Sequence, residues 1–170
     1  YVLAIIFLGF SIFRIFLIPS EKNISSTASL FASVINDPEG GPQSLKQFEN
    51  KIIVLNFWAT WCEPCREEMP ELSNFYSENK SKNVVVVGIA IDEAKAVKSY
   101  LKKTKVIYPI LVDEDKGVIL SKNLGNNQGI LPYTVIINSK GIIQKSILGR
   151  IHKDQLDGIL KPLLQPSKSL

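Results

Sequence analysis

Two long apolar segments constrain the fold of this 170-residue chain most strongly. Residues 52–57 and 84–91 are almost entirely apolar and do not alternate with polar residues, as a strand with one solvated face would. Such runs are typical of parallel strands whose two faces are both covered, and parallel strands need a long crossover connection. Because residues 63–79 between them are predicted to be helical, we expect a strand–helix–strand unit and an α/β fold.

Further elements are expected on both sides of this unit. A turn at residues 37–42 separates a predicted strand near residues 31–35 from a predicted short helix near residues 44–48. Later in the chain we expect a helix over 93–103, a short strand at 110–112, a short helix at 118–123, a hairpin formed by 135–137 and 142–147, and a closing helix over 152–164. These elements predict one domain with a central mixed sheet flanked by helices.

The two cysteines of the chain, Cys62 and Cys65, lie three positions apart at the predicted junction between strand and helix. A thiol attacks a disulfide only as its thiolate, and the N-terminus of a helix favours an anion. Pro64 is well suited to the first turn of that helix. We therefore expect Cys62 to be the exposed attacking sulfur, and Cys65 to be the more buried sulfur that resolves a mixed disulfide.

Two other roles for the cysteine pair are weaker. A structural bridge that closes so short a loop would constrain the unfolded chain little. A structural zinc site needs four ligands, whereas the chain offers two cysteines and a single histidine, His152, which is far away in sequence and is expected at the surface. We accordingly expect redox chemistry without a metal or other cofactor.

The segment 57–65, with its two tryptophans and its Cys-Glu-Pro-Cys motif, resembles the active-site segment of thioredoxin-like proteins. It is most similar to the membrane-anchored TlpA/ResA/CcmG (DsbE) branch of the thiol–disulfide oxidoreductases. The resemblance covers roughly residues 30–164 and includes the residues 131–134 that precede a predicted strand. It implies a thioredoxin-like fold in which Pro132 is cis and faces the cysteine pair. From it we predict a partner-binding surface made by Trp61, Pro64, Leu131 and Pro132.

Glu68 is the candidate proton carrier of the site. It follows Cys65 by three residues, which places both side chains on one helix face. If buried, its pKa would rise and it could exchange a proton with the Cys65 thiol, and ResA-like proteins carry a glutamate at this position. The alternative is a solvated carboxylate, as we expect for Glu67. Asn56 stands where thioredoxins usually have an aspartate, and an amide cannot take that proton at neutral pH.

The direction of electron flow is predicted less directly. Glu63 adds a negative charge between the cysteines, which disfavours a thiolate and thus favours a reducing pair. A disulfide oxidase or isomerase would use the same two cysteines, and the redox potential would distinguish it. A peroxiredoxin-like peroxidase would need a separate peroxide-binding cysteine, and a non-catalytic binding module would keep the pair as a passive bridge.

The N-terminal segment predicts export. Residues 2–18 are 17 residues that are apolar or small except for one charge, Arg14, and this length is at the short end for a membrane span. A cleaved signal peptide is the alternative. We divide the chain into an anchor or signal at 1–19, a linker at 20–29, a thioredoxin-like domain at 30–165 and a tail at 166–170. This predicts a single-pass protein of the bacterial inner membrane with its catalytic domain on the periplasmic or outer side.

The predicted partners follow from the resemblance and from the charge. The resemblance implies a DsbD/CcdA-type electron donor in the membrane. It also implies disulfide-bonded exported proteins as substrates, among them the cysteine pairs of apocytochrome c. The net charge is +4, with lysines scattered among acidic residues, so we expect no binding to nucleic acid. We expect a monomer.

Overall fold

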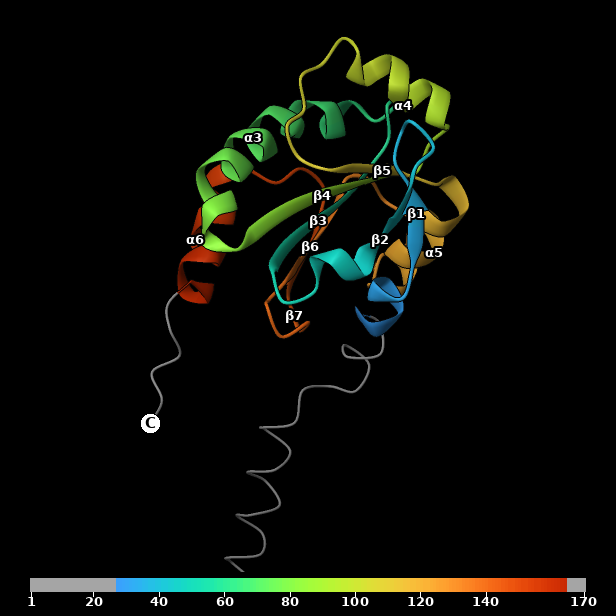
Figure 1. Ribbon diagram of the computed structural model, residues 1–170. Helices are drawn as coiled ribbons and strands as arrows, with labels where there is room; N and C mark the ends of the chain where they lie inside the picture. The colour runs from blue at the N-terminus through green and yellow to red at the C-terminus, as the bar shows by residue number, and fades with distance from the viewer. Residues whose placement is uncertain (1–26, 165–170) are drawn as a thin grey trace, which may run out of the picture.

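The computed structural model describes residues 27–164, which form a sheet with helices packed on both faces (Figure 1). The strands are β1 (Val34–Asn36), β2 (Pro42–Ser44), β3 (Ile52–Trp58), β4 (Val84–Ala90), β5 (Ile110–Val112), β6 (Tyr133–Ile137) and β7 (Ile143–Leu148). The helices are α3 (Glu63–Asn79), α4 (Ala94–Leu101), α5 (Glu114–Asn123) and α6 (Lys153–Leu163), with short 3-10 helices η1 (Leu45–Phe48) and η2 (Lys80–Lys82).

The sheet is mixed and has the order β2-β1-β5-β4-β3-β6-β7. Strands β3, β4 and β5 run parallel to one another, whereas β6 pairs antiparallel with β3 and β7 pairs antiparallel with β6. The predicted α/β fold with a central mixed sheet is therefore confirmed. In this order β3, the strand that leads into the cysteine pair, is covered on both edges by β4 and β6.

The core explains why the central strands lack polar alternation. All seven residues of β3 and all seven of β4 are buried. Alternate side chains of β3 pack with the apolar faces of α3, α4 and α6 on one side of the sheet, and with η1 and α5 on the other. Since each fully buried large apolar side chain contributes about 1.5–3 kcal/mol, these two layers hold the strand end that carries the site in place.

Some boundaries match the prediction, most of the others differ from it by one or two residues, and two elements differ more. Helix α3 and strand β5 have the predicted bounds. The predicted strand near residues 31–35 is wrong in its first half, because residues 27–31 are helical and the strand forms only at Val34–Asn36, where it can pair with β2. Helix α5 begins four residues earlier than predicted because the Asp113 side chain caps it by accepting a hydrogen bond of 2.9 Å from the Lys116 amide.

The predicted anchor and tail, at residues 1–19 and 166–170, lie outside the described residues. Within residues 27–164 no helix combines the length and the apolar character that crossing a membrane requires. The membrane anchor thus stays a prediction from the sequence.

Candidate active site

The cysteine pair lies at the start of α3, directly after the loop that leaves β3. Cys62 is the N-cap of the helix, and Pro64 occupies its first turn. The two sulfurs form a disulfide with an S–S distance of 2.01 Å and a Cα–Cα distance of 5.3 Å. Cys65 is fully buried and Cys62 retains 6% exposure. Cys62 is therefore the outer of the two, but the expectation that it is exposed is wrong for this oxidised form, in which its sulfur is bonded to the buried Cys65.

Apolar residues lie near Cys62, together with the exposed charged residues Glu63 and Arg66. Trp61 is 68% exposed, and Pro64 is also exposed. Leu131 is half-buried and Pro132 is buried, and the peptide bond between them is cis, as the resemblance implied. The pairing of β3 with β6 sets Tyr133 opposite Phe57, so Pro132 lies at the same edge of the sheet as the cysteines. The four residues predicted to bind a partner therefore gather around the end of β3.

Two tryptophans flank the site in contrasting environments. Trp58 is fully buried under the site, and its ring lies 5.6 Å from that of Tyr100, measured between centroids. Trp61 instead offers its indole to solvent beside Cys62. Trp58 thus supports the site from the core, while Trp61 is available to a partner.

The loop between β3 and the cysteines is fixed by a carboxylate that the sequence reasoning did not single out. One oxygen of Asp92, which follows β4, accepts hydrogen bonds from the Thr60 amide at 2.7 Å and from the Thr60 hydroxyl at 2.6 Å. Arg66 donates to the Thr60 carbonyl at 2.9 Å. The sequence could have predicted that Asp92 lies near Thr60. Both residues directly follow parallel strands, and the carboxyl ends of neighbouring parallel strands meet at one edge of the sheet.

Glu68 lies in the interior, one turn beyond Cys65. It is fully buried, so the alternative of a solvated helix carboxylate is wrong. One carboxylate oxygen accepts a hydrogen bond of 2.7 Å from the Asn56 side-chain amide, and the other accepts one of 2.9 Å from the Ile151 backbone amide. Burial raises the pKa of Glu68 to about 7, although both hydrogen bonds oppose the rise. A carboxyl group with this pKa can take up and release a proton near neutral pH.

Polar groups of the interior surround this carboxyl. The Asn56 amide also donates to the Thr134 hydroxyl at 3.0 Å. The Tyr108 hydroxyl is buried, and its pKa is raised above its usual range by burial and, to a smaller degree, by the negative charge of Glu68. Within the described residues the Asn56 side-chain oxygen, the Trp58 indole nitrogen and the Tyr108 hydroxyl have no hydrogen-bond partner.

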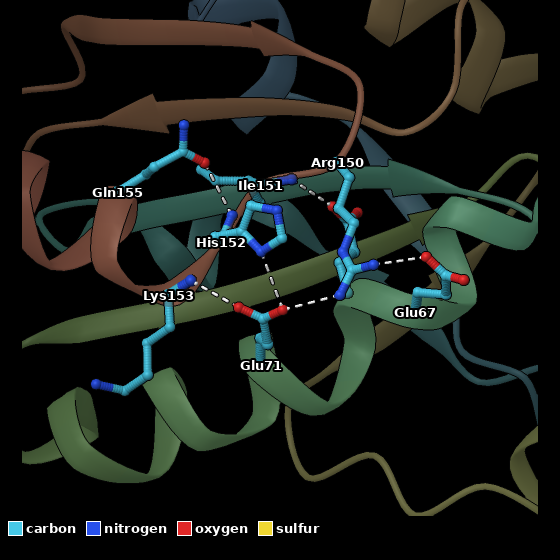
Figure 2. Close-up of polar contacts among 8 residues, drawn as sticks. Glu67, Glu71, Arg150, Ile151, His152, Lys153 and Gln155 are labelled. Atoms are coloured by element: carbon cyan, nitrogen blue, oxygen red, sulfur yellow. Dashed lines mark hydrogen bonds and ion pairs between the residues drawn. The ribbon is translucent and has the colours of Figure 1, made fainter.

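The outer side of α3 carries charged contacts to the segment between β7 and α6 (Figure 2). Glu67 is half-exposed and pairs with Arg150 at 2.5 Å. Its carboxylate is thus partly solvated, as predicted, and also forms an ion pair. His152 is half-exposed, as predicted, and its Nδ1 lies 3.2 Å from Glu71. Among residues 27–164, no group of three or more His, Cys, Asp or Glu side chains is placed to hold a metal ion.

A CxxC disulfide at the start of a helix that follows a central strand, in a mixed sheet of this order, defines a thiol–disulfide oxidoreductase of the thioredoxin fold. The chain belongs to the AhpC/TSA family, whose model matches residues 26–146.

The relatives agree with this class. The chain is 33% identical over 157 residues to the thiol-disulfide oxidoreductase ResA of Bacillus anthracis, covering 91% of this chain and 87% of that protein. It is 29% identical over 163 residues to ResA of Bacillus subtilis (strain 168), covering 95% and 88%. A thiol:disulfide interchange protein of the thioredoxin family from Chlorobium tepidum TLS matches with a TM-score of 0.69 and 29% identity, over 78% of this chain and 93% of that one. The chain is thus a ResA-like thiol–disulfide oxidoreductase with a CxxC redox pair.

Proposed function

We propose that this oxidoreductase works as a membrane-tethered reductase of disulfides in exported proteins. The observation that carries the direction is the two carboxyl groups near the cysteines: Glu63, which directly follows Cys62 in the first turn of α3, and Glu68, buried one turn beyond Cys65. Negative charge near a thiol disfavours the thiolate. A pair whose reduced, thiolate-bearing form is poorly stabilised gives up its electrons readily, which is the property of a reductant.

The reaction uses both sulfurs in turn. The Cys62 thiolate at the helix N-terminus attacks one sulfur of the partner's disulfide, forming a Cys62–partner bond and releasing the partner's other sulfur as a thiolate. Cys65 then loses its proton and attacks the Cys62 sulfur. The Cys62–Cys65 disulfide forms, the partner leaves with both of its sulfurs reduced, each taking a proton from water, and two electrons have passed from this chain to the partner.

Glu68 is the acceptor for the Cys65 proton in this scheme. The carboxyl lies three residues beyond Cys65 in the same helix and is buried with it. With a pKa of about 7, it is ionised in a substantial fraction of molecules at neutral pH and can accept the proton where water is excluded. On re-reduction of the disulfide it returns the proton to the Cys65 sulfur.

The apolar rim around Cys62 is the proposed contact for partners. The exposed indole of Trp61 and the exposed ring of Pro64 flank the outer sulfur, and Leu131 lies at the same edge of the sheet. A surface of this kind binds an unfolded or extended segment around a disulfide through apolar contact, without selecting one sequence.

The cellular setting of the proposal comes from the sequence. The apolar residues 2–18 would hold the domain on the periplasmic or outer side of the bacterial inner membrane. There the oxidised pair would be re-reduced by a membrane donor of the DsbD/CcdA type. Disulfide-bonded exported proteins would be the substrates, and apocytochrome c is one candidate because its haem-binding cysteines must be reduced before haem attachment.

Trapping tests the proposal. In cells that express the full chain with Cys65→Ser, Cys62 should accumulate mixed disulfides with its partners, because the resolving sulfur is gone. Cys62→Ser is the matched control, since the remaining Cys65 is fully buried and should form no adducts. Absence of adducts in the Cys65→Ser chain would contradict catalysis.

The redox potential tests the direction. Equilibration of the purified chain with glutathione buffers should give a potential well below that of the glutathione couple. A potential near that of strong oxidants, roughly −120 mV, would instead favour the oxidase or isomerase.

A further inference from the structure

The buried carboxyl of Glu68 depends on a segment from the far end of the chain. Its second oxygen is bonded to the amide of Ile151, which is 83 residues away in sequence. Ile151 lies in the short connection between the end of β7 at Leu148 and the start of α6 at Lys153. The Ile151 amide is held there by the burial of the Ile151 side chain in the core, by the 2.9 Å hydrogen bond from the Gly149 amide to the Pro132 carbonyl, and by side-chain contacts to α3.

The side-chain contacts form a clamp that consists of Arg150, Glu67 and Glu71 (Figure 2). The two terminal nitrogens of the Arg150 guanidinium bind different carboxylates of α3, Glu67 at 2.5 Å and Glu71 at 3.0 Å. The other oxygen of Glu71 accepts the Lys153 amide at 2.9 Å. The connection is therefore bound to α3 on both sides of Ile151. On the Arg150 side the planar guanidinium binds two carboxylates in fixed directions, so it restricts geometry in addition to pairing charges.

We propose that Arg150 is a positioning residue that, through the clamp, fixes the Ile151 amide on the Glu68 carboxylate and thereby sets the pH at which Glu68 takes up the proton of Cys65. The inference rests on the role of Glu68 in the proposed function. Arg150 itself touches neither sulfur, and it acts through the backbone of the residue that follows it.

The groups that face Glu68 show why the position of the Ile151 amide affects the pKa of Glu68 more than the charge of Arg150 does. Asn56 faces it from β3, Tyr108 from the segment before β5, Arg150 from the connection, and Glu71 from its own helix. Among the effects that lower the pKa of Glu68, the hydrogen bond from Ile151 is the largest and the charge of Arg150 is smaller. Since two carboxylates already pair with Arg150, much of its charge is neutralised at the distance of Glu68.

The test is a titration of Glu68 itself. The full chain is kept oxidised, labelled at the glutamate carboxyl carbons and held in mild detergent because residues 2–18 are apolar. Carbon-13 NMR then follows the carboxyl signals with pH, and the Glu68→Gln chain identifies the signal of Glu68. Arg150→Lys keeps the charge but loses the fork, and Arg150→Met loses both. We expect both variants to raise the titration midpoint of Glu68 on the order of one pH unit.

Glu71→Gln distinguishes an effect of charge from an effect of position, because the two predict opposite shifts in the titration midpoint of Glu68. Removing the negative charge of Glu71 would by itself lower the midpoint of Glu68, whereas loosening the clamp raises it. We expect an upward shift. Lys145→Met is the matched control, because this exposed lysine of β7 carries the same charge as Arg150 and lies outside the clamp, so its removal should leave the midpoint unchanged.

Three results would overturn the proposal. One is a midpoint in Arg150→Lys equal to that of the unmodified chain, which would mean that charge alone acts. Another is a downward shift in Glu71→Gln, and the third is no shift in any clamp variant. The readout needs no disulfide exchange. Failed trapping of partners would therefore contradict the proposed function but not the role of the clamp. Unshifted midpoints would contradict the role of the clamp but not the proposed function.

Discussion

The buried carboxyl of Glu68 should make the domain lose stability as pH rises. Its pKa in the folded protein is about 7, against 4.5 for an unperturbed glutamate. Between these values the folded state holds a proton that the unfolded state has released, so the free energy of unfolding falls as pH increases through this window. Each unit of difference between the folded and unfolded pKa values corresponds to about 1.4 kcal/mol, so the loss in the free energy of unfolding reaches about 3 kcal/mol above pH 7.

Glu68→Gln removes this loss because an amide stays neutral at every pH. The new amide needs an acceptor, and the Asn56 side-chain oxygen, which has no partner within the described residues, can serve once the Asn56 amide is turned over. At pH 4 the variant and the unmodified chain should therefore unfold with free energies within about 1 kcal/mol of each other. At pH 8 the variant should be more stable by about 2 kcal/mol. This gain is smaller than the loss of about 3 kcal/mol that it removes, because the charge-assisted hydrogen bonds of the carboxylate are lost.

Urea unfolding of the oxidised chain measures this difference. Fluorescence reports it well because Trp58 is fully buried beneath the disulfide. Glu114→Gln is the matched control, since this exposed glutamate lies in α5 and the same chemical change there should move the free energy little at either pH. A variant-minus-parent difference that is the same at pH 4 and pH 8 would refute the reasoning, as would a Glu68→Gln chain that is less stable than the unmodified chain at pH 8.

Two further predictions concern the frame of the site. Gly88→Ala should lower the free energy of unfolding by about 1–3 kcal/mol, measured in urea, because the added carbon would lie 2.7 Å from Ile110 and 3.1 Å from Trp58. Gly158→Ala in α6, where nothing lies within 4 Å, should instead raise it by about 0.5–1 kcal/mol, and an equal loss at both positions would contradict this packing argument. Asp92→Asn should cost about 1–2 kcal/mol by weakening both bonds to Thr60, and an unchanged urea midpoint would argue against this role of the carboxylate.

The parts of the fold that local pattern determines were predictable from the sequence. The runs that became β3 and β4 are buried on both faces, and such strands are apolar throughout. Helix α3 matched in both bounds because Pro64 marks its first turn and the residues up to Asn79 suit a helix. The strand at Val34–Asn36 was misplaced, since only pairing with β2 decides which of these residues become extended.

From spacing alone the site was predictable within helix α3, and the resemblance added Leu131 and Pro132 from outside it. Spacing alone placed Glu68 on the face of Cys65, and the structure shows it buried. The contacts that Ile151 and Arg150 make there were not predictable, because these residues reach α3 through the packing of α6 against it, and Ile151 is 83 residues from Glu68 in sequence. Sequence spacing carries no signal for such a meeting.

The distance in sequence between Glu68 and its backbone donor has a consequence for biosynthesis. A nascent chain that has emerged as far as β6 already contains both cysteines and the strands on either side of β3. It lacks Ile151, so one oxygen of the carboxyl lacks its backbone donor until the last stretch of the domain has left the ribosome. The two cysteines are therefore synthesised early, whereas the hydrogen bonding of the Glu68 carboxyl is completed last, when α6 docks.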